Sequence, residues 1–161
     1  MDVFEEHQLG FNIRRATVND LGSLLRIEAE CFTEEAFSKD QLVYCLLAPD
    51  FVTLAALVDD EIVGFVTGSV EMSAEESVGH VYTLDVKKVH RKRGIGSKLL
   101  EALETALAEK GVRIFVLEVR VDNVPARRLY SKHGYKLLAR LKDYYDQNVD
   151  AVRLRKTLAT P

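Results

Sequence analysis

The sequence has few of the features that place a protein in a membrane, outside the cell or around a metal ion. No apolar run approaches the roughly 18 residues that span a bilayer. The acidic N-terminus, MDVFEEHQLG, lacks the basic and then apolar pattern of a signal peptide. The two cysteines, Cys31 and Cys45, form no CxxC motif, and the four histidines show no i,i+4 pairing. We therefore expect a cytoplasmic protein with no bound metal and no membrane contact.

Length and composition indicate one globular unit. The 161 residues are 47% hydrophobic and 29% charged, which is typical of a domain that buries a core without disulfides. There are no repeats, low-complexity stretches or linkers. We expect a single domain over residues 1–161, in which residues 1–10 form a flexible N-terminal extension.

Charge is divided unevenly between the two halves of the chain. Residues 1–80 contain 4 Lys or Arg and 16 Asp or Glu, a net charge of −12, whereas residues 81–161 contain 18 and 9, a net charge of +9. The basic half suits an anionic ligand and the acidic half suits a cationic one. Nucleic acid is an alternative ligand for the basic half, but no aromatic residues are interleaved with its basic residues to stack on bases. We therefore expect two partners of opposite charge and no nucleic acid.

Hydrophobic periodicity and capping signals predict alternating strands and helices. Capping boxes begin helices after Thr17 and Ser38, and Gly111 and Gly134 end two later helices. The polar and acidic residues 71–79 predict a loop. The order of elements is typical of one mixed α/β domain. The predicted strands cover residues 11–16, 51–58, 62–70, 80–86, 113–119, 137–141 and 151–158, and the two later helices cover 96–110 and 125–133.

A basic, glycine-containing segment joins a predicted strand to an amphipathic helix. Its sequence has the form R-x-x-G-x-G, from Arg91 to Gly96. Glycines allow a tight turn and close approach of a ligand to the backbone, and a helix N-terminus favours an anion. A dinucleotide fingerprint would need glycine where the chain has Leu99, and a Walker loop would need lysine directly after Gly96. The two remaining interpretations are a phosphate-binding loop and a solvated basic loop with turn glycines.

Glu118 interrupts the apolar run of residues 113–119. An unpaired buried carboxylate is costly, so it is either paired or kept for chemistry. Burial raises the pKa of a carboxyl group toward the range useful for a general base. The alternative is an ion pair with a nearby arginine such as Arg120.

Tyr130 and Asn123 also allow two interpretations each. Tyr130 lies on the predicted helix after Pro125, where its hydroxyl could donate a proton to a leaving thiolate. It could equally be an amphipathic core tyrosine. Asn123 precedes the same helix and could serve only as its N-cap.

The assembled pattern resembles the GNAT superfamily of N-acetyltransferases over residues 12–158. The segments that carry the resemblance are R-x-x-G-x-G, LEVRVDN, ARRLYSKHGY and DYYDQNVDA. Residues 117–120, Asn123, Tyr130 and the Tyr144–Tyr145 pair resemble the RimI and archaeal N-alpha-acetyltransferase group, which modifies protein N-termini. The resemblance implies an α/β (mixed α+β) GNAT fold. This fold has a mostly antiparallel seven-stranded sheet with a splayed parallel pair at the cofactor site, flanked by about four helices.

The same resemblance implies roles for individual residues, with acetyl-CoA as cofactor. Glu118 would be the general base acting through a water molecule, Tyr130 the general acid to the CoA sulfur, and His80 a second residue that holds water. The acceptor would lie between two walls, formed by Phe32, Glu35 and Phe37 and by Tyr144 and Tyr145. The implied cofactor contacts are the backbone of Leu84, Asp85 and Val86, the pyrophosphate loop of Arg91, Lys92, Arg93, Gly94, Ile95, Gly96 and Ser97, and the side chains of Asn123 and Tyr130.

Two segments depart from the pattern of this group. Bacterial RimI proteins carry Pro-Trp near one wall, where residues 32–37 of this chain read FTEEAF. The segment YYDQNVDA has Asn148 where the common Tyr-Tyr-x-x-Gly-x-Asp-Ala form has glycine. These departures concern the specificity for the first residue of the acceptor and the position of the loop.

The implied activity is that of an EC 2.3.1 acyltransferase, which transfers acetyl from acetyl-CoA to a protein N-terminus by direct attack in a ternary complex. An α-amine with a pKa near 8 is about one-tenth neutral at pH 7, whereas neutralising a lysine requires about 4.6 kcal/mol. A modest base therefore suits an N-terminus. The alternatives are a GNAT enzyme for lysines or small amines such as polyamines, and a non-catalytic acyl-CoA-binding module. We expect ribosomal proteins or nascent chains as partners and a monomer or weak homodimer.

Overall fold

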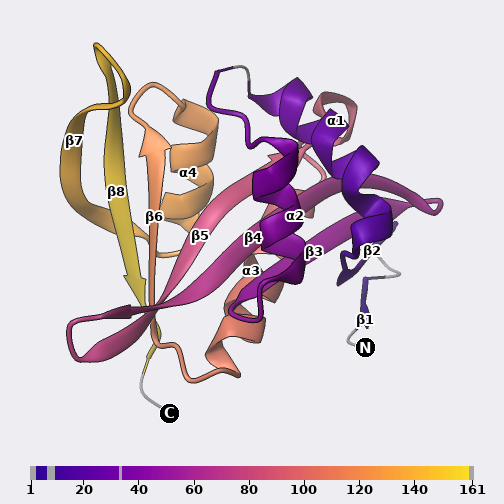
Figure 1. Ribbon diagram of the computed structural model, residues 1–161, viewed down its shortest axis with the longest axis horizontal. Helices are drawn as coiled ribbons and strands as arrows, with labels where there is room; N and C mark the ends of the chain where they lie inside the picture. Colours follow the sequence, from indigo (N-terminus) through magenta and orange to yellow (C-terminus); the bar gives the residue numbers. More distant parts are fainter. Residues whose placement is uncertain (1–2, 7–9, 33, 160–161) are drawn as a thin grey trace.

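The computed structural model describes residues 3–6, 10–32 and 34–159, and these residues build an eight-stranded sheet (Figure 1). The strands lie side by side in the order β1-β2-β3-β4-β5-β6-β8-β7. Neighbouring strands are antiparallel except β5 and β6, which are parallel. The strands are β1 (Val3–Glu6), β2 (Phe11–Arg15), β3 (Phe51–Val58), β4 (Glu61–Ser73), β5 (Glu76–Val86), β6 (Ile114–Arg120), β7 (Lys136–Asp146) and β8 (Val149–Thr157).

Strands β2–β8 form the expected seven-stranded sheet, and β1 adds an eighth strand at its edge. β1 pairs with β2 from Val3↔Arg14 to Glu6↔Phe11. Four residues of the expected flexible extension therefore form a strand, whereas residues 1–2 and 7–9 of it lie outside the described residues. The sequence VFEE has no alternating apolar pattern, and its pairing uses backbone groups that any sequence provides.

The loop expected at residues 71–79 is instead the tip of a β-hairpin. β4 continues to Ser73 and β5 begins at Glu76, with Glu71 opposite Val78 in the register. The hairpin extends beyond the core, so its polar side chains remain in solvent and hide the strand signal. As a result, Glu71 lies on a strand next to the central site.

Helices cover both faces of the sheet (Figure 1). α1 (Leu21–Cys31) and α2 (Lys39–Leu47) lie on one face, and α3 (Ile95–Ala108) lies on the other. α4 (Val124–Lys132) follows β6, and short 3-10 turns form at Val18–Asp20 (η2) and Lys88–His90 (η3). None of the described helices combines the length and the apolar character that crossing a membrane requires.

Two apolar clusters attach the helices to the sheet. The leucine stripe of α3, including Leu99 and Leu103, is fully buried against the side of the sheet that contains Phe115. On the opposite face, Leu24 and Ile27 of α1 pack with Phe65 of β4. The helical period seen in the sequence therefore reports the buried face of α3 correctly.

One extra residue in β5 shapes the centre of the sheet. Thr67 of β4 is opposite Thr83 and Gly68 is opposite Val81, so Tyr82 forms a β-bulge. The bulge reverses the alternation of side chains, so Tyr82 and Thr83 both face the α1–α2 side. The pairing of β5 with β6 ends at Val81↔Leu117, although both strands continue. Beyond that point the two strands diverge and leave a gap between them (Figure 1).

Candidate active site

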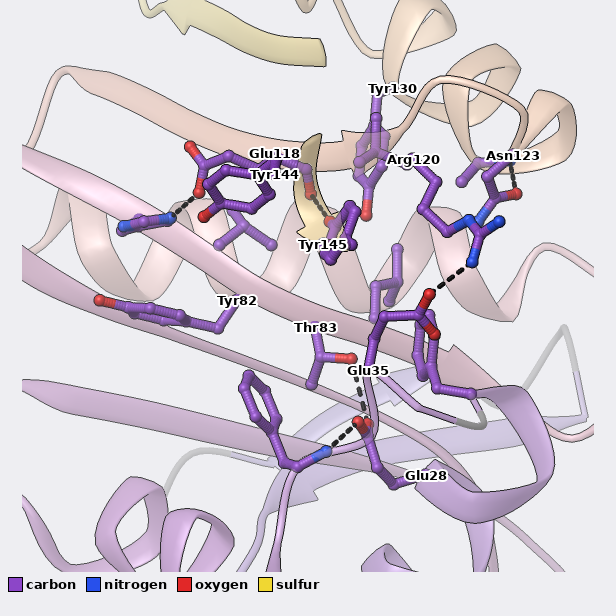
Figure 2. A pocket seen from close by; sticks show the side chains of 17 residues that line it. Glu28, Glu35, Tyr82, Thr83, Glu118, Arg120, Asn123, Tyr130, Tyr144 and Tyr145 are labelled. Carbon is purple, nitrogen blue, oxygen red and sulfur yellow. Dashed lines mark hydrogen bonds and ion pairs between the residues drawn. The ribbon is translucent and has the colours of Figure 1, made fainter. Parts of the chain in front are cut away.

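A pocket opens where β5 and β6 separate (Figure 2). Its walls come from α1 and the loop after it, from β5, from β6, from α4 and from β7. The structure brings together here all of the predicted catalytic and acceptor-binding residues: His80, Glu118, Tyr130, Phe32, Glu35, Phe37, Tyr144 and Tyr145.

Glu118 belongs to a chain of charged side chains that begins at Glu71. Glu118 Oε1 lies 2.7 Å from His80 Nε2, and His80 Nδ1 lies 3.1 Å from Glu71 Oε1. The second oxygen of Glu118, Oε2, accepts a hydrogen bond from Arg153 Nε at 2.9 Å. The Glu118 side chain is 7% exposed. The buried carboxylate is therefore paired, and its arginine partner is Arg153 rather than Arg120.

This pairing reverses the effect that burial alone has on Glu118. Burial raises the pKa of Glu118, but the hydrogen bonds and charges of His80 and Arg153 outweigh it and hold the pKa below its ordinary value. The prediction that the pKa of Glu118 is raised is therefore wrong. For His80, burial lowers the pKa, and Glu118 and Glu71 overcome that effect and raise it. His80 is thus the stronger base of the pair.

Tyr82 covers His80 and joins the same network. Their rings stack with centroids 4.2 Å apart, and the Tyr82 hydroxyl donates a hydrogen bond to Glu71. Burial, followed by this bond, raises the pKa of Tyr82. Sequence reasoning missed Glu71, Tyr82 and Arg153. Glu71 was placed in a loop, and the contacts of the other two depend on the bulge and on the pairing of β8 with β6.

Tyr130 projects its hydroxyl into the pocket (Figure 2). The residue is 7% exposed, and its ring packs edge-on against Tyr135 at 5.7 Å. Burial raises the pKa of Tyr130, and the neighbouring Asp85 adds to this effect. Tyr130 is therefore both a buried tyrosine and a donor that faces the site.

Tyr144 and Tyr145 of β7 form one wall of the pocket. The rings of Tyr144 and Tyr145 meet edge-on at 5.0 Å, and the Tyr145 hydroxyl donates to the backbone oxygen of Glu118 at 3.3 Å. Burial raises the pKa of Tyr145 to about 12. Tyr144 is 46% exposed and stands at the mouth of the pocket.

The opposite wall is tied to β6 by an ion pair. Glu35, in the segment between α1 and α2, pairs with Arg120, which also pairs with Asp122 at 3.0 Å. Asn123 accepts a hydrogen bond from Ala126 N at 3.3 Å and is thus the N-cap of α4. Asn123 also lines the pocket, so its predicted contact with the cofactor stays a prediction.

The backbone of β5 faces the gap at alternate residues. Lys87 N donates to Val63 O of β4 at 2.8 Å. Along an antiparallel pair, the backbone N–H and C=O groups of one residue bond the neighbouring strand and those of the next residue point away from it. The N–H and C=O groups of Leu84 and Val86 therefore point into the gap. The backbone groups of Asp85 point toward β4 instead, which distinguishes it from the other two predicted contacts.

The glycine loop places open backbone at the start of α3. Gly94 is the N-cap and has a φ of 84°, in the left-handed region that favours glycine. A Cβ at Gly94 would meet nothing within 4 Å, and one at Gly96 would meet only side chains at 3.5 Å and beyond. The N–H groups of Ile95, Gly96 and Ser97 belong to the first helical turn, where the helix supplies no acceptor, so they favour an anion.

The basic side chains of this loop differ in direction. Arg91 donates from Nε to Val86 O at 2.9 Å and contacts Cys31 Sγ at 3.5 Å, which places it at the end of β5. Lys92 and Arg93 are exposed. A gap lined by backbone amide groups that leads to a basic helix N-terminus fits a thioester of coenzyme A, which combines an amide-containing arm with a pyrophosphate.

Comparison with known proteins agrees with this geometry. The profile of the acetyltransferase (GNAT) family matches residues 21–135. The catalytic subunit NAA10 of the N-terminal acetyltransferase A complex of Arabidopsis thaliana is 34% identical over 148 residues, which are 91% of this chain and 77% of that protein. An N-alpha-acetyltransferase of Saccharolobus solfataricus is 28% identical over 157 residues, which are 92% and 93% of the two chains.

A solved structure shows the same fold. The crystal structure of Ard1 from Thermoplasma volcanium matches with a TM-score of 0.83 and 25% identity, covering 94% of this chain and 99% of that one. The family profile covers more than half of the chain, and the gap and the glycine loop suit the donor that this family uses. The chain therefore belongs to the GNAT family of acetyltransferases and takes acetyl-CoA as its acetyl donor.

Proposed function

We propose that this acetyltransferase modifies the N-terminal α-amine of proteins. The observation that carries the proposal is a two-walled pocket, between Tyr144–Tyr145 and the α1–α2 segment, that contains the buried Glu118–His80 pair. Such a pocket admits the end of a peptide chain and presents a base to its amine. The names of the two relatives described above, which match more than nine-tenths of this chain, support the proposal.

The walls of the pocket suit a peptide with a positively charged end. The Tyr144 hydroxyl can donate and accept hydrogen bonds, and the Tyr145 hydroxyl, which donates to Glu118 O, can still accept one, which matches the amide groups of a backbone. Phe32 and Phe37 offer apolar surface to the first side chain of the acceptor. Glu118 carries a negative charge on the pocket wall, which attracts an ammonium group before its proton is removed.

Glu118 accepts the proton of the amine, and His80 positions Glu118 for that step. Glu118 receives it from the amine through a water molecule, because the nitrogen becomes strongly acidic as it forms its new bond. A carboxylate with a lowered pKa is sufficient for that step. His80, whose pKa is raised, donates a hydrogen bond from Nε2 to Glu118 at 2.7 Å and keeps the carboxylate ionised and oriented for that step. Glu71, on the other side of the ring, stabilises the imidazolium of His80.

The donor side of the site supplies hydrogen bonds to developing charge. Acetyl-CoA supplies a thioester acyl carbon to the amine when it is bound. The Leu84 N–H points into the gap beside the pocket and is placed to stabilise negative charge on an acyl oxygen. Tyr130 retains its proton because its pKa is raised, and it donates a hydrogen bond to a departing sulfur. Each unit by which the pKa of Tyr130 exceeds that of the departing thiol opposes complete proton transfer by about 1.36 kcal/mol, so the hydrogen bond is the main contribution of Tyr130.

A panel of acceptors tests the proposal. Purified protein is incubated with acetyl-CoA and one of three acceptors, and the acetylated position is located by mass spectrometry. The acceptors are a lysine-containing peptide with a free N-terminus, the same peptide with a blocked N-terminus, and spermine. We expect acetylation of the free α-amine alone. Equal or better transfer to the blocked peptide or to spermine would replace the proposal with the lysine or polyamine alternative. Binding of acetyl-CoA without turnover of any acceptor would indicate a non-catalytic module.

A further inference from the structure

Two buried carboxyl groups lie beneath the acceptor pocket, and neither takes part in the chemistry proposed above. Glu28 of α1 and Asp85 of β5 are 2% and 1% exposed. Thr83 stands between them, with its Oγ1 2.5 Å from Asp85 Oδ1 and 3.2 Å from Glu28 Oε1. Figure 2 shows Thr83 and Glu28 on the side of the pocket opposite Tyr144.

The number of protons in this group decides its state. A hydroxyl group donates one hydrogen bond, so Thr83 cannot donate to two carboxylates at once. If both acids were ionised, one short oxygen–oxygen contact would contain no proton, and two negative charges would be buried without a bonded cation. One additional proton resolves both problems. One acid then donates to Thr83 Oγ1, and Thr83 donates to the other acid.

The hydrogen bonds of the two acids indicate where that proton resides. Glu28 Oε2 accepts from the backbone N–H of Phe37 at 2.8 Å, so both oxygens of Glu28 have donors. Asp85 Oδ2 is buried and has no hydrogen-bond partner, which is more costly for an ionised carboxylate than for a neutral acid. The contact of 2.5 Å between Asp85 and Thr83 suits a carboxylic O–H donor. The proton therefore belongs on Asp85.

The surroundings of Asp85 agree with a neutral acid. Burial raises the pKa of Asp85 well above its usual range, and Glu28 raises it further. The other titratable groups near Asp85 are Tyr130 and the thiol of Cys31. Burial raises the pKa of the Cys31 thiol to about 11. Arg91 is the nearby cation, but its hydrogen bonds go to Val86 O and Cys31 Sγ.

We propose that Asp85 and Glu28 hold one proton between them at neutral pH. The resulting chain of hydrogen bonds, which we call the relay, runs from Asp85 through Thr83 to Glu28 and ends at the Phe37 N–H, and its role is to position the segments that it connects. Thr83 and Asp85 flank Leu84, whose backbone faces the donor gap, and Phe37 lies on the acceptor wall. The relay thus fixes the distance between the α1–α2 segment, which forms one wall of the acceptor pocket, and β5, which faces the gap. Loss of the shared proton at high pH breaks the relay and loosens the α1–α2 segment. The link to the acceptor rests on the proposed function, whereas the shared proton does not.

The shared proton is tested without any transfer reaction. Carbon-detected NMR follows the carboxyl carbons of Asp and Glu through a pH titration, and the D85N and E28Q variants assign the two resonances. We expect one carboxyl group that remains protonated through neutral pH and whose resonance is missing in D85N. If the resonances of both Asp85 and Glu28 titrate as ordinary acids well below neutrality, the shared proton is absent and the proposal is overturned.

The positioning role is tested by separating KM from kcat. T83V removes the hydroxyl at constant shape, and we expect it to raise the KM for the peptide about tenfold, the effect of one buried hydrogen bond, while kcat changes less. The matched control is T67V, which removes a fully buried hydroxyl from the cross-strand neighbour of Thr83 that belongs to a different network with Thr53. A peptide KM that is unchanged in T83V, or equally changed in T67V, contradicts the positioning role.

A conservative variant gives a second readout that does not depend on the stability of T83V. In D85N an amide N–H replaces the acid proton as donor to Thr83, and it cannot be lost at high pH. We expect the peptide KM of the wild type to rise at alkaline pH and that of D85N to stay flat, while D85A has a raised KM at every pH. Parallel pH profiles for wild type and D85N would overturn the proposal. If no variant and no wild type acetylates any peptide, the proposed function fails, and the NMR titration still decides the shared proton.

Discussion

Arg153 stands directly opposite Glu118 in the register between β8 and β6, and its Nε donates to Glu118 Oε2 at 2.9 Å. This bond leaves Oε1 to His80 and helps to hold the pKa of Glu118 below its ordinary value. A cross-strand arginine thus sets how readily the proposed base is protonated in acid.

Replacing Arg153 therefore moves the acid limit of activity. In Arg153→Gln the pKa of Glu118 rises, so Glu118 becomes protonated at a higher pH. We expect the acidic limb of the kcat/KM profile to shift upward by about half a unit to one unit, since the half-buried arginine is partly screened by solvent. The control is Arg155→Gln, which removes the same charge two residues further along β8, opposite Val116. If Arg153→Gln and wild type have equal pH profiles, the ionisation that produces the acidic limb is not that of Glu118.

Removing the carboxylate of Glu118 lowers turnover more than affinity. We expect Glu118→Gln to reduce kcat by about 10²–10⁴, the range for loss of a general base, and to leave the dissociation constant of acetyl-CoA within about twofold. Stopped-flow or steady-state kinetics and calorimetry measure the two quantities. Glu109→Gln, an exposed position after α3, is the matched control. A kcat close to wild type would exclude Glu118 as the base.

The His80–Glu118 pair makes the free energy of unfolding depend on pH in a defined window. The pKa of His80 is raised above 6.5, so its contribution is complete below that value and is lost as pH rises through the folded pKa. The pKa of Glu118 is lowered from 4.5, so its contribution is complete above that value and is lost in acid. We expect the stability difference between wild type and His80→Gln, on the order of 1 kcal/mol, to be largest between these two values and to shrink toward pH 9.

Urea unfolding at several pH values measures this window. His133 supplies a control of opposite sign, because burial lowers its pKa and the folded state therefore favours its neutral form. Relative to His133→Gln, the wild type should gain stability as pH rises. The same pH trend for both histidine variants would contradict the assignment of the window to the His80–Glu118 pair.

Tyr130 is expected to affect departure of the sulfur rather than binding. Tyr130→Phe keeps the buried ring and removes the hydroxyl, and we expect kcat to fall about 10- to 100-fold with little change in the KM for the peptide. Thioesters of more acidic thiols need less help in leaving, so the loss should be smaller with such donors. A loss that does not vary with the acidity of the thiol would assign Tyr130 to packing alone.

The basic loop predicts a salt-dependent affinity for the donor. Arg93→Ala removes an exposed charge next to the N-terminus of α3, and we expect it to weaken acetyl-CoA binding about fivefold at low salt. Added salt screens the remaining charges, so the dissociation constant of the variant should rise less steeply with ionic strength than that of the wild type. Lys110→Ala, at the far end of α3, should leave both values unchanged.

The sequence predicts the elements of this protein better than the interactions between them. The leucine period of α3, the glycine stop at Gly134 and the apolar run of β6 each reflect a local rule and are found where expected. The hairpin at residues 71–79 and strand β1 were missed because their pairing uses backbone groups and leaves no apolar pattern.

The candidate site shows the same division. Glu118 stands out in the sequence as a charge in an apolar strand, and Tyr130 by its place on the helix after Pro125, whereas the roles of Tyr144 and Tyr145 were implied by the family resemblance alone. The sign of the pKa shift of Glu118 does not follow from burial alone, because it depends on His80 and Arg153, which reach it from two other strands. The relay through Thr83 depends on the bulge at Tyr82, and no local pattern marks a bulge.

The donor gap has a consequence for how the enzyme tolerates change. Leu84 and Val86 face it with peptide groups, and every amino acid except proline carries the same N–H. Substitutions at these two positions change the packing of the core and leave the backbone groups that line the gap intact. The side chains along this edge can therefore vary while the enzyme still recognises acetyl-CoA. Proline at position 84 or 86 is the replacement that would delete a donor outright.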